Sequence, residues 1–241
     1  MIKILCALMI VVITADIAFC TTYSSMKFKC SVCGTEKEYR VLTSTNAFGP
    51  SDLDTRPPEM QRSTMPMWVQ ECPECGYAAS EISDSCDVSP DFLKSEAYIT
   101  CEGRELKSSL ASRFYKVSMI QKECGNIRGA FFAVLHGAWA CDDAKDMAGA
   151  LACREKAASF ADELIADESL NASQRENIML MRADILRRAG RFEDVIRLYS
   201  GVKFSGKKNN LEVMNAVLKF ELELARKEDS RCYTIKDALR E

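Results

Sequence analysis

The stretch CSVCG at residues 30–34 returns further along the chain as CPECG at residues 72–76. Two residues between paired cysteines let a tight turn direct both thiolates at one ion. The glycine that follows permits the positive φ that turns backbone N–H groups toward the sulfurs. Two such turns, called knuckles below, supply the four ligands of a closed tetrahedral Zn²⁺ site, which has no open position for catalysis. The predicted ligands of this structural zinc ion are Cys30, Cys33, Cys72 and Cys75.

Two other uses of these cysteines stay open. A thiol–disulfide oxidoreductase needs a CxxC pair with a lowered thiol pKa at a helix N-terminus within a βαβ setting, and residues 72–75 show no such setting. A redox pair would also leave the second knuckle unexplained. Structural disulfides are compatible with an exported chain. Zinc is the preferred interpretation.

The distribution of proline and the spacing of apolar residues change at Pro90. All six prolines lie between Pro50 and Pro90, whereas apolar residues after Pro90 recur at helical spacing. We therefore expect an α+β fold that is mainly α. A zinc-ribbon-like module with a Pro-rich inserted loop is expected over residues 21–90, with strands at 39–43 and 67–70, and a helical domain over residues 91–241.

The helical part contains one recognisable pattern. Residues 181–199, MRADILRRAGRFEDVIRLY, resemble a tetratricopeptide repeat (TPR), with Gly190 as the turn between two helices. Weaker copies are expected over residues 131–164 and 211–239. The copies are too far apart for a regular repeat and lack its full pattern, so we expect TPR-like antiparallel hairpins; an irregular helical bundle stays open.

Residues 27–79 run from CSVCGTEKEYRV through a Pro-rich loop to WVQECPECGYAA. This pattern resembles an uncharacterised bacterial family, labelled only as a domain of unknown function, that joins a split zinc ribbon to a TPR-like helical tail. The resemblance extends to about residue 200. It implies the same four metal ligands and no activity. The apparent leader and the additional cysteines depart from the family pattern and question a cytoplasmic role.

Residues 1–20 have the composition of an export signal, with Lys3 ahead of an apolar run too short for an ordinary membrane span. Small residues near Cys20 predict cleavage before Thr21. The expected location is extracytoplasmic, periplasmic or secreted, with no stable membrane span after cleavage. Two alternatives are a lipoprotein anchored at Cys20 and a cytoplasmic protein whose translation starts at Met26.

Six further cysteines lie beyond the leader and the knuckles. They are Cys86, Cys101, Cys124, Cys141, Cys153 and Cys232. In an exported chain this even number is compatible with three disulfides, and we expect at least one. Cys141 and Cys153 are expected to face each other across a helical hairpin. The alternative is that several are small buried hydrophobic residues.

The Pro-rich loop carries the best non-metal candidate site. If the loop is extended, Asp52, Asp54 and Arg56 project to one side and bind a polar ligand or pack the ribbon on the helices. Local ion pairing and turn capping are preferred to ligand binding. The single histidine, His136, is expected to be a packed helix residue. Asn171 begins a glycosylation motif that otherwise indicates a helix cap.

Charge and composition narrow the function. Apolar residues make up 47% and charged residues 28% of the chain, which argues against a chain that is disordered or membrane-embedded along most of its length. The net charge of −3 and the acidic ribbon argue against nucleic-acid binding. The expected function is a non-enzymatic extracytoplasmic scaffold for a protein or peptide; the alternative is a thiol–disulfide factor or another enzyme. Residues 175–208 are basic, and Arg182 and Arg187 are the expected partner contacts.

Overall fold

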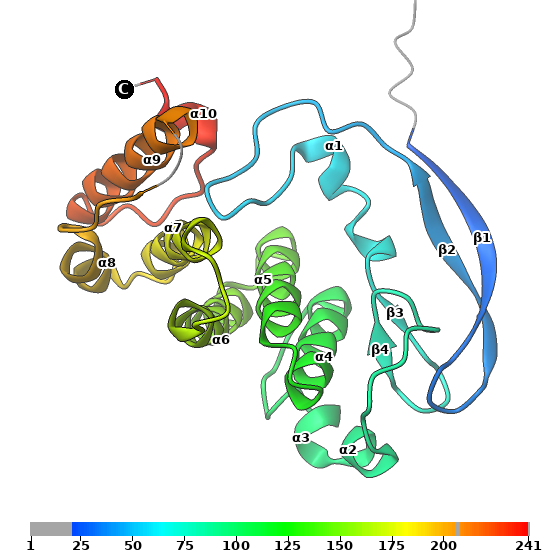
Figure 1. Ribbon diagram of the computed structural model, residues 1–241. Coiled ribbons are helices and arrows are strands. Elements are labelled where there is room, and N and C mark those ends of the chain that lie inside the picture. Colours follow the sequence, from blue (N-terminus) through cyan, green and yellow to red (C-terminus); the bar gives the residue numbers. More distant parts are fainter. Residues whose placement is uncertain (1–20, 206–207, 241) are drawn as a thin grey trace, which may run out of the picture.

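The computed structural model describes residues 21–205 and 208–240 of the chain. Two small antiparallel sheets come first and a succession of helices follows, so the expected α+β, mainly α fold is confirmed (Figure 1). The predicted signal peptide, residues 1–20, lies outside the described residues. None of the helices within the described ranges is long and apolar enough to cross a membrane.

The N-terminal elements are β1 (Thr22–Lys29), β2 (Glu36–Ser44), α1 (Glu59–Arg62), a 3₁₀ turn η1 (Met65–Met67), β3 (Gln70–Glu71) and β4 (Ala78–Ala79). The helices that follow are α2 (Pro90–Lys94), α3 (Glu96–Ile99), α4 (Ser109–Glu123), α5 (Ile127–Asp143), α6 (Met147–Ala166), α7 (Ala172–Arg188), α8 (Phe192–Tyr199), α9 (Lys208–Arg226) and α10 (Ile235–Ala238).

The two sheets are hairpins. β1 pairs with β2 from Lys29 opposite Glu36 outward, and β3 pairs with β4 over two residues. The expected strand at residues 39–43 lies in β2. The expected strand at 67–70 is mostly wrong, because a 3₁₀ turn with Pro66 in its first turn extends to Met67 and only Gln70 is in a strand. Proline at the start of a helical turn loses no hydrogen bond there, which favours the turn.

Consecutive helices are joined by short turns of one design. The turns after α4, α5 and α7 each contain one residue with positive φ: Gly125, Lys145 and Gly190. After α7, the N–H of Gly190 donates to the Arg187 carbonyl and that of Arg191 to the Leu186 carbonyl, both at 2.9 Å. This is the Schellman arrangement that ends a helix and reverses the chain. The turn after α5 has the same two bonds, from Lys145 N–H to the Asp142 carbonyl at 3.0 Å and from Asp146 N–H to the Cys141 carbonyl at 2.9 Å. These turns agree with antiparallel hairpins at residues 131–164 and 181–199.

One continuous apolar core connects the hairpins to the helices. It includes the ribbon residues Cys30 and Tyr77, Tyr98 of α3, Phe114 of α4, and extends to Leu218 of α9. β4 packs directly on α4. Because the ribbon contributes to the same core as the helices, its position on them is determined by apolar burial.

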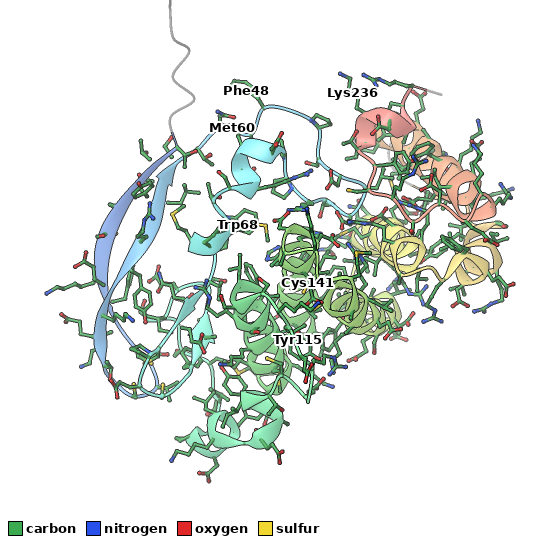
Figure 2. The ribbon with its side chains drawn as sticks, turned by 180° about the vertical axis from the view of Figure 1, so that it is seen from behind. Phe48, Met60, Trp68, Tyr115, Cys141 and Lys236 are labelled. Atoms are coloured by element: carbon green, nitrogen blue, oxygen red, sulfur yellow. A yellow bond between two sulfur atoms is a disulfide. The ribbon has the colours of Figure 1, made fainter. Side chains whose placement is uncertain are left out.

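The Pro-rich loop spans the molecule and contacts the C-terminal segment. Leu53 N–H donates to the Tyr233 carbonyl at 3.0 Å, and Ile235 N–H donates to the Ser51 carbonyl at 2.9 Å. Phe48, 77% exposed, lies on the outer side of this loop (Figure 2). The loop therefore joins residues that are far apart in sequence.

Candidate metal centre

The first knuckle closes the end of the β1–β2 hairpin. Cys30 N–H donates to the Thr35 carbonyl, and Gly34 N–H donates to the Cys30 carbonyl, both at 2.9 Å. Gly34 has a φ of 76°, a conformation that glycine adopts without a steric cost. Cys30 is buried and Cys33 is exposed. The knuckle therefore directs the Cys30 side chain toward the core and leaves the Cys33 side chain accessible to solvent.

The second knuckle repeats the first in the β3–β4 hairpin. Cys72 N–H donates to the Tyr77 carbonyl at 2.8 Å, and Gly76 N–H donates to the Cys72 carbonyl at 3.0 Å. Gly76 has a φ of 72°. The same two hydrogen bonds at the same offsets make the knuckles equivalent, and each hairpin supplies two thiols.

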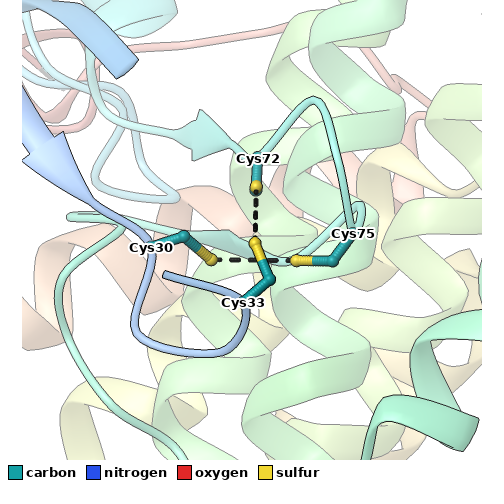
Figure 3. Close-up of side chains that lie close together, drawn as sticks. All are labelled: Cys30, Cys33, Cys72 and Cys75. Atoms are coloured by element: carbon teal, nitrogen blue, oxygen red, sulfur yellow. Dashed lines mark hydrogen bonds between the residues drawn. The ribbon is translucent and has the colours of Figure 1, made fainter. Parts of the chain in front are cut away.

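The four thiols point toward one another (Figure 3). The Sγ atoms of Cys33 and Cys72 are 3.5 Å apart, those of Cys30 and Cys75 are 3.7 Å apart, and all four lie within 4.8 Å of one another. A tetrahedral ion with metal–sulfur bonds of about 2.3 Å has sulfur–sulfur edges of about 3.8 Å. The cluster therefore has the size and donor set to hold one metal ion.

Local hydrogen bonds and burial act on the thiols in opposite directions. The Thr35 hydroxyl, 3.3 Å from Cys33 Sγ, and the Thr35 backbone N–H lower the pKa of Cys33 to about 6. Burial raises the pKa of Cys72 and of Cys75. Since four thiolates within one cluster also repel one another, a bound cation is the natural counter-charge.

Aromatic hydroxyls hold the second knuckle in place. Tyr98 of α3 donates to the Gly76 carbonyl at 2.6 Å, and Tyr39 of β2 donates to the Glu71 carbonyl at 3.0 Å. Burial, with the nearby thiols adding, raises the pKa of Tyr39 to about 12, so it remains a donor at neutral pH. These bonds fix the two hairpins relative to each other and to the helices.

The loop residues Asp52, Asp54 and Arg56 are buried and pair with charged side chains of other parts of the chain, which is the preferred ion-pairing role. The extended geometry is wrong, since residues 52–56 form a turn with Thr55 at positive φ. Arg56 pairs with Asp143 of α5 through Nη2 contacts of 2.7 and 2.6 Å. The loop therefore packs the ribbon module on the helices, which was one of the two expected roles.

Both aspartates of the loop have partners outside the turn, and those of Asp54 come from distant helices. Asp52 Oδ1 accepts from Arg62 at 2.5 Å. Asp54 Oδ2 accepts from Trp139 Nε1 at 2.7 Å and from Arg188 at 2.9 Å. The charges of Asp52, Asp54 and Arg56, on which the ligand-binding hypothesis depended, are each paired with an oppositely charged side chain of the same protein.

The expected partner contacts Arg182 and Arg187 are buried, so they are not the exposed groove residues that the basic stretch predicted. Arg187 is 0% exposed and pairs with Glu221 of α9 at 2.7 Å and with Asp184 at 2.5 Å. Arg182 is 9% exposed and pairs with Asp162 of α6 at 2.7 Å. These arginines join helices to one another.

The other cysteines divide into one disulfide and four thiols. Cys86 and Cys124 form a disulfide that ties the segment before α2 to the end of α4. Cys101, Cys141, Cys153 and Cys232 are free thiols, so three disulfides are not present in the described chain. Cys141 and Cys153 do face each other across α5 and α6, and the hydrogen bond from Cys141 raises the pKa of Cys153.

Two minor predictions are confirmed. His136 packs in α5 with its ring centroid 5.3 Å from those of Trp68 and Phe114, and burial lowers its pKa to about 4. The Asn171 side chain accepts from Gln174 N–H at 2.9 Å and forms a capping box at the start of α7.

Sequence reasoning did not identify Arg113, which lines the space between β2 and α4 beside Cys72. Its place on a helix of mixed composition carries no signal of this position.

Comparisons with protein-family models, curated proteins and solved structures found no match to the chain.

Proposed function

We propose that the chain is a non-enzymatic scaffold, stabilised by one structural zinc ion, that binds a protein or peptide outside the cytoplasm. The convergence of four thiols from two equivalent knuckles carries this proposal. Sulfur donors disfavour Mg²⁺ and Ca²⁺, and tetrahedral four-sulfur sites suit zinc or iron. The likeness to the bacterial family of split zinc ribbons belongs to the same proposal.

A scaffold role is favoured over turnover because of the coordination number. An ion with four thiolate ligands has no open position for substrate or water. The ribbon and the helices share one core, so the ion stabilises a single body that presents its surface to a partner. Stacked helical hairpins offer extended surfaces of the kind that bind peptides.

Three observations support a location outside the cytoplasm. Residues 1–20 have the pattern of an export signal. The Cys86–Cys124 disulfide is of a kind that persists in oxidising compartments. Translation from Met26 would remove half of β1, whose residues 22–29 pair with β2.

Metal analysis of the purified protein tests the proposal. We expect about one zinc per chain, and Cys72→Ser should release it because three thiolates bind Zn²⁺ more weakly than four. Cys232→Ser, which removes a thiol outside the cluster, should retain the zinc. Stoichiometric zinc in a Cys30/Cys72 double serine variant would contradict the assignment of the ligands, and iron in place of zinc would contradict the metal.

The alternative, a thiol–disulfide factor, is favoured by the exposure of Cys33, 3.5 Å from the Cys72 sulfur. It predicts a thiol in the metal-loaded protein that iodoacetamide labels rapidly at pH 6 and whose loss abolishes disulfide exchange. The scaffold proposal predicts slow labelling, because zinc occupies all four sulfurs. Measuring the labelling rate with and without a chelator distinguishes the two.

A further inference from the structure

Two adjoining cavities lie beneath the β1–β2 hairpin. The larger, of about 490 Å³, is bounded by β2, by η1 and by the segment that follows η1. The smaller, of about 470 Å³, extends from β2 to the second knuckle. Both are lined by Tyr39, Gln70 and Arg113. We treat them as one groove, called the hairpin groove.

The hairpin groove follows the edge of β2. Its lining includes the consecutive residues Lys37, Glu38, Tyr39 and Arg40. Successive side chains of a strand point to opposite faces, so the larger cavity, which contacts Glu38, Tyr39 and Arg40 in succession, reaches the edge of β2. It also extends to Tyr23 of β1. Within the described residues β2 pairs only with β1, which leaves its second edge free (Figure 1).

The hairpin itself is poorly covered. None of the residues of β1 and β2 is buried, although two-stranded hairpins are marginally stable without packing on one face. A free strand edge beside a cavity is the arrangement that accepts an extended peptide as an added strand. The four residues from 37 to 40 correspond to about 13 Å of strand.

The charge of the groove indicates the partner. Arg113 is half-buried and makes no ion pair or hydrogen bond to any described residue. Arg40 lies over the Tyr23 ring, 3.6 Å from its centroid, and lines the same cavity. Of the two acids in the lining, Glu71 is neutralised by Lys116 at 2.6 Å, which leaves Glu38. The basic side chains therefore exceed the acidic ones.

We propose that the hairpin groove binds an extended acidic peptide as a third strand beside β2, with a peptide carboxylate between Arg40 and Arg113. This inference rests on the proposed scaffold function and names the partner's chemistry. The carboxylate belongs in the larger cavity, because the smaller one reaches Cys72, where a zinc–tetrathiolate centre is negative and repels it. Guanidinium–carboxylate hydrogen bonds are charge-assisted and are among the stronger polar contacts in proteins.

Selection from a random heptapeptide library displayed on phage, with the zinc-loaded full chain as the target, tests the proposal. We expect selected peptides enriched in Asp and Glu. For the strongest of them, synthesised with a fluorescent label, Arg113→Gln and Arg40→Gln should each raise Kd about tenfold or more. Arg128→Gln, an exposed arginine of α5 outside the groove, should leave Kd unchanged. Zinc content and circular dichroism verify that each variant is folded.

N-methylated peptides test the proposed backbone hydrogen bonds between the peptide and β2. In a peptide strand only every second N–H faces β2, so N-methylation along the peptide should weaken binding at alternate positions. A uniform effect of N-methylation overturns the strand model.

Acidic peptides whose Kd is unchanged by both arginine substitutions overturn the groove assignment while the scaffold function survives at another surface. Selection of basic or neutral peptides overturns the charge argument. If no peptide is enriched above the empty support, both proposals fail.

Discussion

At the scale of single residues, this protein buries charged side chains that the sequence pattern predicted to be exposed. Arg187 pairs with both Asp184 and Glu221, and burial raises the pKa of each of these carboxyls. Two acids sharing one arginine in a dry interior favour a proton held between them. Losing the arginine would leave uncompensated buried charge, which is the most destabilising change a buried ion pair can undergo.

His136 makes stability depend on pH in a defined window. Burial lowers its pKa to about 4, against 6.5 for the unfolded chain, and the carboxylate of Asp54 offsets only part of that effect. The folded state therefore excludes a proton that the unfolded state binds below pH 6.5. The stability from the neutral ring is complete above pH 6.5 and is lost as pH falls toward 4. Between pH 7 and pH 5 this amounts to about 2 kcal/mol.

Urea unfolding at pH 7 and pH 5 measures this effect. We expect the wild-type chain to lose about 2 kcal/mol more than His136→Gln over that interval, whatever the absolute stability of the variant. Because the carboxylates are common to both proteins, they cancel in the comparison. Equal losses in the two proteins would show that His136 titrates normally in the folded state.

At the scale of elements, the helix-to-helix turns repeat one backbone design with different residues. Gly125 and Gly190 occupy the positive-φ position after α4 and α7, whereas Lys145, at a φ of 55°, occupies it after α5. A non-glycine residue in this conformation carries a cost of about 1 kcal/mol. The turn after α5 thus adopts the same backbone conformation without a glycine.

Substitutions at these positions should have opposite signs. Gly190→Ala should destabilise the protein by about 1 kcal/mol through backbone strain alone, because a Cβ at this position meets no atom within 4 Å. Lys145→Gly should be neutral or stabilising by up to about 1 kcal/mol. Gly201→Ala, at a glycine without positive φ, is the control. Urea midpoints at constant m-value give the three differences, and a cost at Gly201 equal to that at Gly190 would refute the strain explanation.

At the scale of the whole molecule, the four-cysteine cluster and the helices belong to one core. Tyr98 of α3 bonds to the second knuckle, and Cys72, Tyr77 and Phe114 lie in the same buried cluster. The loop that runs between the two hairpins also contacts the C-terminal segment through Leu53. A perturbation at the knuckles therefore reaches helices that bind no metal.

Removing the metal should lower the stability of the entire chain. We expect a strong chelator to reduce the Tm of the helical circular-dichroism signal, with a single transition before and after, because the ion binds only the folded state. The Cys232→Ser chain, with its zinc intact, should respond to the chelator in the same way. An unchanged helical Tm, with loss of structure confined to the hairpins, would mean that the ribbon unfolds independently.

Sequence by itself determined the features that depend on neighbouring residues. Within each knuckle the two thiols lie together because CxxCG encodes a turn whose geometry is local, and the helix ends follow from Gly125, Gly190 and Asn171 for the same reason. The sequence motif predicts that the two knuckles meet, but the packing of the two hairpins brings Cys30 to Cys75 and Cys33 to Cys72. The order of the elements, with strands first and the long helices after them, and so the fold class, also follows from local pattern.

Only the tertiary structure decided which charges are exposed. Arg187 becomes a buried helix-to-helix contact because Glu221, 34 residues away, lies opposite it. Asp54 is buried because Trp139 and Arg188 meet it from two helices. A charge can enter a dry interior when its partner is fixed beside it, and the partner's position is a property of the packed chain and not of the local sequence. The same holds for Arg113, which lines a cavity beside β2 and has no ion-pair or hydrogen-bond partner among the described residues.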